Sequence, residues 1–201
     1  MPNNADVRVG APDQAITGAI KHAPLGTTLP SLSSITKASV TLDQAFVGDE
    51  YVSEDGLTLT PSTSTTDIKD WSGSIVRKLM ESFDGTLHWR MISTNEGALD
   101  IAFGSANVTS QAATSSHGKQ VQAQLGAHLP ERQSWVFLMK DGDARVVIVV
   151  PDGQVTEVGE VTFASNAAIG WDVTLSTYPD SSENNIYIMT DDGVVTSSTS
   201  T

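Results

Sequence analysis

The two strands that the sequence predicts on either side of Asp141-Gly142 are apolar on both faces. Since successive side chains of a strand point to opposite sides, the strand before this turn presents two apolar sets: Trp135, Phe137 and Met139 on one face, and Val136 and Leu138 on the other. A strand buried on both faces needs a covering layer on each side. The sheet must therefore pack on another sheet, on its own loops or on other subunits.

Turn signals predict an antiparallel arrangement. Asp-Gly occurs five times, and three of these pairs stand between apolar-alternating runs, which is typical of tight β-hairpins: Asp84-Gly85, Asp141-Gly142 and Asp152-Gly153. We expect the last two to join residues 135–140, 144–150 and 154–163 into a three-stranded meander. Further strands are predicted at residues 18–23, 57–60, 86–92, 119–125, 168–177 and 186–190.

The strand at residues 168–177 alternates cleanly. Its apolar set is Ile169, Trp171, Val173 and Leu175, and its polar set includes Asp172, Thr174 and Ser176. Such a strand places one face on the core and the other in water.

A single helix is predicted at about residues 93–103. Ser93 and Glu96 have the spacing of a capping box, with Ser93 as N-cap, and Gly104 suits the helix end. Residues 62–66 and 105–118 are polar without periodicity and are expected to form loops. We divide the chain into an N-terminal arm (1–17), a β domain (18–190) and a flexible C-terminal tail (191–201).

Composition excludes several classes of protein. The 201 residues include no cysteine, so disulfides and thiolate metal sites are ruled out. With 11 Lys and Arg against 24 Asp and Glu, the net charge of −13 argues against a protein that grips nucleic-acid phosphates. There is no leader-like segment and no apolar run near the ~20 residues of a membrane span, so we expect a protein that is made and kept in the cytoplasm, or assembled there.

The sequence shows no constellation of catalytic or metal-ligand residues. The histidines His22, His88, His117 and His128 lack metal-ligand spacing, and neither a nucleophile elbow nor a phosphate loop is present. We therefore expect no enzyme activity, no metal and no cofactor.

Trp71 differs from the other three tryptophans because it lies in a polar stretch. One reading is a loop tryptophan folded back on its own core. The other is an anchor that packs into a neighbouring chain, since tryptophan is enriched at interface hot spots.

An ordered set of segments resembles the major tail proteins of long-tailed bacteriophages of actinobacteria. These segments are 48–56, 60–62, 65–71 and 76–77, with 23–27, 94–95, 103–104, 170–171 and 178–179 in the same order. The resemblance implies a β-sandwich or barrel of the tail-tube type, with one helix and long loops. It also implies a virion protein whose rings of six subunits stack into a hollow tube through which the genome passes.

From the resemblance we expect inter-subunit and ring-stacking contacts at Asp67, Lys69, Asp70, Trp71 and Arg77. Asp172, Thr174 and Ser176 are candidates for the lumen, where acidic residues would repel DNA that transits without specific binding. Arg90 would hold DNA there, so we expect it to pair with an acid or face another subunit. The implied partners are further copies of this chain and the tape measure, tail terminator and tail tip proteins, without a membrane. Assembly would take place in the host cytoplasm.

Two alternatives remain at this stage. One is a tail terminator or head–tail connector that forms a single ring. The other is a non-viral β-sandwich that binds carbohydrate or acts as an adhesin.

Overall fold

The computed structural model describes residues 7–13, 18–48 and 50–195. Within these residues the chain forms nine strands, one α-helix and two short 3-10 helices. In chain order they are β1 (Ile20–Pro24), η2 (Leu32–Ser34), β2 (Val52–Lys69), β3 (Ile75–Met91), α1 (Glu96–Phe103), η3 (Ser105–Asn107), β4 (Val108–Gln111), β5 (Gln120–Ala123), β6 (Gln133–Asp141), β7 (Ala144–Val158), β8 (Trp171–Thr177) and β9 (Tyr187–Asp191).

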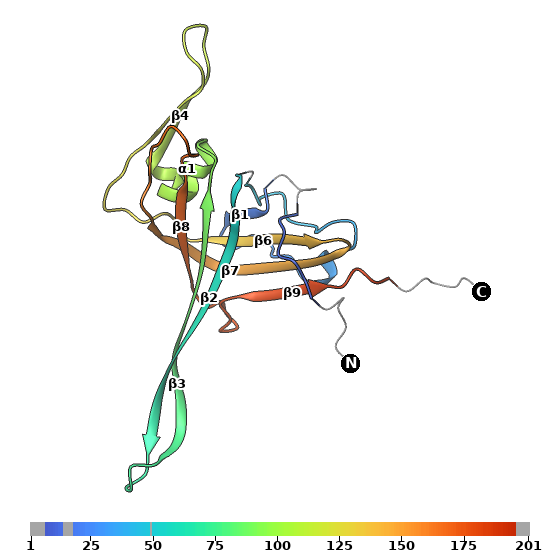
Figure 1. Cartoon of the computed structure of the whole chain (residues 1–201), viewed down its shortest axis with the longest axis vertical. Helices are drawn as coiled ribbons and strands as arrows, with labels where there is room; N and C mark the ends of the chain where they lie inside the picture. The colour runs from blue at the N-terminus through green and yellow to red at the C-terminus, as the bar shows by residue number, and fades with distance from the viewer. Residues whose placement is uncertain (1–6, 14–17, 49, 196–201) are drawn as a thin grey trace, which may run out of the picture.

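One sheet organises the molecule (Figure 1). Its strand order is β1-β6-β7-β8-β3-β2, β9 pairs with β7 beyond the end of β8, and β4 and β5 form a separate small sheet. Every strand pair is antiparallel. The predicted fold class, mainly antiparallel β with one short α-helix, is confirmed.

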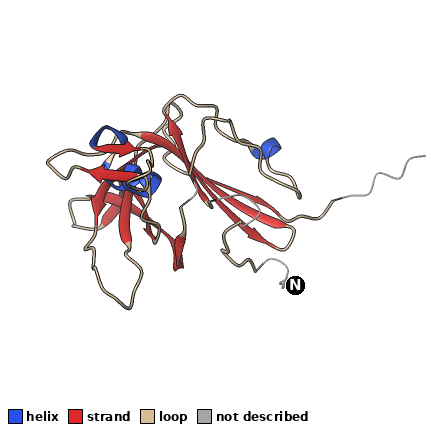
Figure 2. Ribbon diagram, turned by 90° about the horizontal axis from the view of Figure 1, so that it is seen from above, coloured by secondary structure: helices blue, strands red, loops and turns tan. Residues whose placement is uncertain are grey.

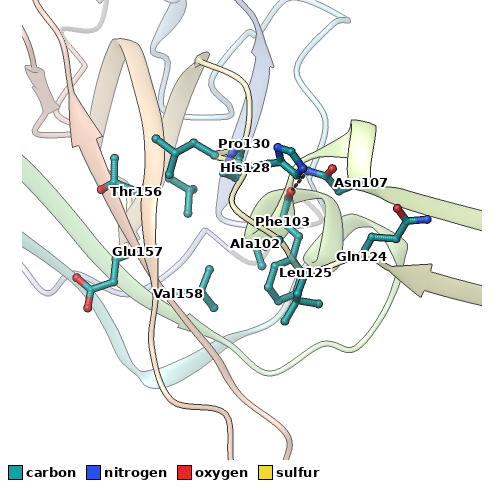
Figure 3. Close-up of a pocket in the computed structure, with 13 residues that line it drawn as sticks. Ala102, Phe103, Asn107, Gln124, Leu125, His128, Pro130, Thr156, Glu157 and Val158 are labelled. Atoms are coloured by element: carbon teal, nitrogen blue, oxygen red, sulfur yellow. Dashed lines mark hydrogen bonds between the residues drawn. The ribbon is translucent and has the colours of Figure 1, made fainter.

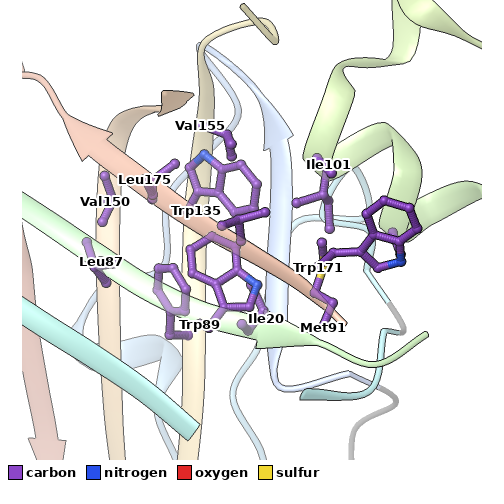
Figure 4. Close-up of a cluster of buried hydrophobic side chains, with 14 of the residues drawn as sticks. Ile20, Leu87, Trp89, Met91, Ile101, Trp135, Val150, Val155, Trp171 and Leu175 are labelled. Atoms are coloured by element: carbon purple, nitrogen blue, oxygen red, sulfur yellow. The ribbon is translucent and has the colours of Figure 1, made fainter. Parts of the chain in front are cut away.

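The sheet is curled, so that strands that are not neighbours face each other across the main core (Figure 4). Trp89 of β3 packs against Trp135 and Phe137 of β6, with ring centroids 5.6 and 5.5 Å apart. Helix α1 closes this cluster through four buried residues, Ala98, Leu99, Ile101 and Ala102.

The opposite face of β6 and β7 carries a second core, as the doubly apolar pattern predicts. Val136 and Leu138 point into it and are buried. Its cover comes from the connection between β1 and β2, which contributes Ile35, Val40 and Phe46. Figure 2 shows α1 and the connection with η2 on opposite sides of the main sheet. Of the three predicted kinds of cover, the chain's own loops supply this one.

Only one of the three predicted Asp-Gly hairpins forms. Gly142, with φ 61°, makes the turn between β6 and β7, where a left-handed residue is required. Asp84-Gly85 and Asp152-Gly153 instead lie inside the long strands β3 and β7, so the predicted meander is wrong. At Gly85 the missing side chain leaves room for Ile186 and Thr177, because an added Cβ would lie 2.7 and 2.9 Å from them.

Two local predictions need correction. The helix begins after Asn95, whose side chain accepts a hydrogen bond from the Ala98 amide; Ser93 is not the N-cap, because its hydroxyl accepts from the Tyr51 amide instead. Residues 105–118 are not a bare loop, because they contain η3 and β4, and β4 pairs with β5.

The described part of the N-terminal stretch packs on the body. Pro12 bridges to Met139, and Asp13 forms a buried ion pair with Arg145 of β7. Arg145 also donates to the carbonyls of Thr36 and Ala38, so it ties three segments together. At the other end, an added Cβ at Gly193 would clash with Asp143. Residues 1–6 and 14–17 of the predicted N-terminal arm and residues 196–201 of the predicted C-terminal tail lie outside the described residues. The domain boundaries stay a prediction.

Candidate assembly surface

Strands β2 and β3 extend far beyond the rest of the sheet. They have 18 and 17 residues, but β3 pairs with β8 only from Thr86 to Met91. The remaining part, residues 62–84, projects from the body as a two-stranded hairpin (Figure 1). We call this segment the arm. It replaces the loop predicted at residues 62–66, and its Thr-rich sequence is favourable for strands.

The turn at the tip is built by one side chain. Asp70 Oδ1 accepts from the Ser72 hydroxyl and the Ser74 amide, at 2.6 and 2.8 Å. These hydrogen bonds lower the pKa of Asp70. The turn presents Trp71 to solvent with its side chain fully exposed. In this chain, the reading in which Trp71 folds back on its own core is therefore wrong.

The arm carries exposed apolar side chains on both faces. Directly paired residues share a face, so the pairs Thr63–Phe83 and Thr65–Met80 lie on one side. A bulge shifts the register between Ser64 and Thr65. Beyond it, the pairs Thr66–Leu79 and Ile68–Arg77 lie on the opposite face. The exposed apolar residues are Ile68, Trp71, Ile75, Val76, Leu79, Met80 and Phe83. Neither face is covered by the described part of the chain.

The five residues predicted for inter-subunit contacts come together at the distal end of the arm. Asp67 pairs with Lys78 across the two strands, with Oδ1 and Nζ 2.7 Å apart. Lys69 lies opposite Ile75, Arg77 lies opposite Ile68, and Asp70 and Trp71 form the turn. Sequence reasoning missed the hairpin that unites them, although the turn-forming Asp70–Ser74 segment is its signal.

The predicted lumen residues lie on a second, polar surface. Register joins the residues of four strands into two rows: Thr60, Thr86, Ser176 and Gln154, and then Thr58, His88, Thr174 and Glu157. Asp172 pairs with Arg90 in the next row. We call this surface the wet face. Its strand β8 alternates as predicted, with Trp171, Val173 and Leu175 buried.

Asp172 is not a lone acid. Its carboxylate oxygens lie 3.7 Å from Arg90 Nη1 and 3.8 Å from His88 Nε2. The expectation that Arg90 pairs with an acid is confirmed. Gly170 leaves the room that the Arg90 guanidinium occupies. These contacts partly balance the charges of the wet face. Its remaining side chains carry mostly hydroxyl and amide groups.

The described residues contain neither a cluster of three or more His, Asp or Glu that could hold a metal ion nor a helix long and apolar enough to cross a membrane. The features that stand out are a projecting apolar arm and a polar sheet face. Together with the fold, they define a mainly antiparallel β-protein whose exposed surfaces suit contact with other protein chains.

Comparison with known proteins gives the family. A model of the family described as "Phage tail tube protein" matches residues 1–200. The chain belongs to this phage tail tube protein family. It is thus a structural protein of a virion tail, and the non-viral alternative is set aside.

Two solved structures are similar to this chain. One is the anti-feeding prophage cap, described as a tube terminating cap, with 14% identity, a TM-score of 0.45 and coverage of 92% of this chain and 94% of that chain. The other comes from the virion of a native gene transfer agent particle, with 9% identity, a TM-score of 0.39 and coverage of 74% and 92%. No curated protein matches the sequence.

Proposed function

We propose that this protein is the repeating subunit of the tail tube, that six copies form a ring, and that rings stack into a hollow cylinder that conducts the genome. The observation that carries the proposal is the arm. Its two faces expose large apolar side chains, with Met80 71% and Val76 61% exposed, and Trp71 stands free at the tip. An exposed apolar surface of this kind marks a protein–protein contact.

The arm also explains why several copies are needed. A two-stranded hairpin is only marginally stable by itself in water. In the described part of the chain, no other element packs on either face of this hairpin. Because apolar residues lie on both faces, a single flat partner would leave one face in water. Insertion between two neighbouring subunits covers both, and a closed or stacked ring provides such a slot at every position.

The wet face is our candidate for the lumen, with Asp172, Thr174 and Ser176 at its centre. Support comes from its four-stranded polar surface, which backs directly onto the buried core. Arg90 and His88 lie beside Asp172. The passing DNA is therefore kept from binding this wall less by charge repulsion than the net charge of −13 suggests. A hydroxyl-lined wall offers few cations to phosphates, and few phosphate contacts means weak binding.

The remaining partners follow from this role. We propose that the tube contacts the tape measure, tail terminator and tail tip proteins within the virion, after assembly in the host cytoplasm. The segments quoted from the sequence further favour a long-tailed phage of actinobacteria.

Electron microscopy of concentrated recombinant protein tests the proposal. Tubes are expected; lone rings would favour a terminator or connector, and monomers at all concentrations would contradict the proposal. Trp71→Ala should give a folded monomer that makes no tubes, because removal of a central interface tryptophan costs about 2–4 kcal/mol per contact. Leu32→Ala is the matched control, since Leu32 is also well exposed but lies outside the arm.

The lumen assignment has its own test. Thr174→Lys and Ser176→Lys should leave tubes intact and slow genome ejection, since each lysine adds a phosphate contact. A map that placed Asp172 on the outer wall would overturn the assignment while leaving the tube proposal standing.

A further inference from the structure

A pocket of about 200 Å³ opens beside α1 (Figure 3). Its apolar walls come from Ala102 and Phe103 of α1, Val155 and Val158 of β7, and Leu125 and Leu129 of the connection between β5 and β6. Leu125 and Leu129 are 74% and 60% exposed, so its rim offers apolar surface to solvent.

Hydrogen bonds hold the pocket walls in place before any partner arrives. The Asn107 side-chain amide donates to the backbone carbonyl of Phe103 at 2.8 Å. The backbone N–H of Gln124 donates to the backbone carbonyl of Asn107 at 2.9 Å. On the far side, Gln154 Nε2 donates to the Pro130 carbonyl at 2.7 Å. A preformed site loses little entropy when it is filled.

Its size indicates a single side chain as the occupant. Small-molecule pockets are usually about 300–1,000 Å³, so this one is too small for such a ligand. An aromatic ring fits its mixed lining, because a tryptophan combines a large apolar body with one N–H donor. Gln124 and Glu157 supply acceptors at the edge.

The chain itself carries a free aromatic group at the opposite end. Trp71 lies at the tip of the arm, at one end of the longest axis, and α1 lies toward the other end (Figure 1). The arm of one copy therefore cannot reach its own pocket but can reach that of the next copy along this axis. Head-to-tail contacts of this kind close into a ring if their rotation closes, and otherwise they continue as an open stack. Because the arm and the pocket are separated along the longest axis, we expect an open stack.

Charge favours the same pairing. The distal arm, residues 67–78, carries three bases and two acids, in a chain whose net charge is −13. Glu157 lines the pocket. Asp100 lies on α1, which forms one wall, and Glu131 follows the lining residue Pro130, while Lys119 is already paired to Glu96. Burial and the neighbouring Glu96 and Glu131 raise the pKa of Asp100, as expected for carboxylates crowded together.

We infer that the pocket between α1, β7 and the β5–β6 connection receives Trp71 from a second copy of this chain, with Lys69 and Arg77 against its acidic rim. The inference rests on the proposed function, because it names the receiving site for the arm in a stack of subunits. One end of a stack would therefore present empty pockets, and the other end would present free arms.

Introduced cysteines test this contact cleanly, because the chain has none of its own. Ser72→Cys labels the tip and leaves Trp71 in place, and Leu129→Cys labels the rim. Mixed under oxidising conditions, these two variants should form a disulfide-linked dimer in at least tenfold excess over the control pair of Ser72→Cys with Leu32→Cys. Adding Trp71→Ala to the tip variant should abolish the product.

A second variant checks occupancy of the pocket. Gln124→Trp places a ring at the mouth, and it should leave the monomer folded by circular dichroism but block growth of tubes. If the wild-type chain forms tubes but the two cysteine variants form no Ser72–Leu129 crosslink, or if Gln124→Trp forms normal tubes, the pocket is overturned while the tube proposal stands. If the cysteine variants give no crosslink and the wild-type chain gives no assemblies, the proposed function fails together with this inference.

Discussion

The two ends of the hairpin formed by β2 and β3 have the same secondary structure and opposite surroundings. At the body end, Leu87, Trp89 and Met91 of β3 are at most 1% exposed. At the arm end of the same strand, Val76 and Met80 are largely exposed. Hydrogen bonding between strands thus continues well past the point where hydrophobic burial ends. The body is stabilised by its own core, whereas the arm keeps its apolar side chains available for partners.

This contrast predicts that tryptophans at the two ends act on different properties. Trp89→Ala should lower the free energy of unfolding by about 3–5 kcal/mol, because it opens a cavity between Trp135 and Phe137. Trp71→Ala should change it by less than about 0.5 kcal/mol. Urea titrations of both monomers measure the difference. Equal destabilisation would mean that the arm packs on its own body in solution.

Ion pairs should show the same division. Asp13→Ala leaves Arg145 buried without its carboxylate and should cost about 3–5 kcal/mol. Asp67→Ala on the arm removes a partly exposed pair with Lys78 and should cost less than about 1 kcal/mol. Thermal unfolding of the two variants compares them. Arg145→Met combined with Asp13→Ala should recover part of the loss, and no recovery would contradict burial as the cause.

Gly85 lies where the arm leaves the body, and its replacement tests how closely this junction is packed. Gly85→Ala should cost about 1–3 kcal/mol, because the new Cβ would meet Ile186, Phe83 and Thr177. Gly118→Ala is the matched control in an open loop and should stay within about 0.5 kcal/mol. If Gly85→Ala proved neutral in urea titrations, the junction would be looser than the packing indicates.

A smaller effect is expected from pH in the body. Burial beside Trp135 lowers the pKa of His22, although a hydrogen bond with Gln133 opposes this. The unfolded chain therefore binds the proton first, and stability should fall as pH drops below about 6.5. The slope cannot exceed about 1.4 kcal/mol per pH unit for one proton. His22→Gln should flatten the profile of stability against pH between pH 5 and 6.5.

Much of the body could be predicted from local pattern. Alternation located β8 and its polar face, and the doubly apolar run at residues 135–139 required cover on both sides of β6. The turn at Asp141-Gly142 was also correct. Asp84-Gly85 and Asp152-Gly153 misled, because a glycine that relieves close packing inside a long strand has the same local sequence as one that forms a turn.

The arm was harder to predict for a related reason. A Thr- and Ser-rich strand without a buried face shows no hydrophobic alternation, so residues 62–66 resembled a loop. Trp71 was marked as an exception by its polar neighbours, but sequence alone left it between core and interface. Only the register of β2 on β3 placed it at an exposed tip.

The sequence by itself determined the class of this protein: an acidic, cysteine-free, mainly β chain with sheet faces that need cover, in the phage tail tube family. Tertiary structure decided which element covers each apolar sheet face and which faces stay uncovered. The connection between β1 and β2 closes one core because its apolar residues reach the face of β6 and β7. The arm stays open because it extends beyond every other element, and such placement depends on contacts between distant residues, which local sequence does not encode.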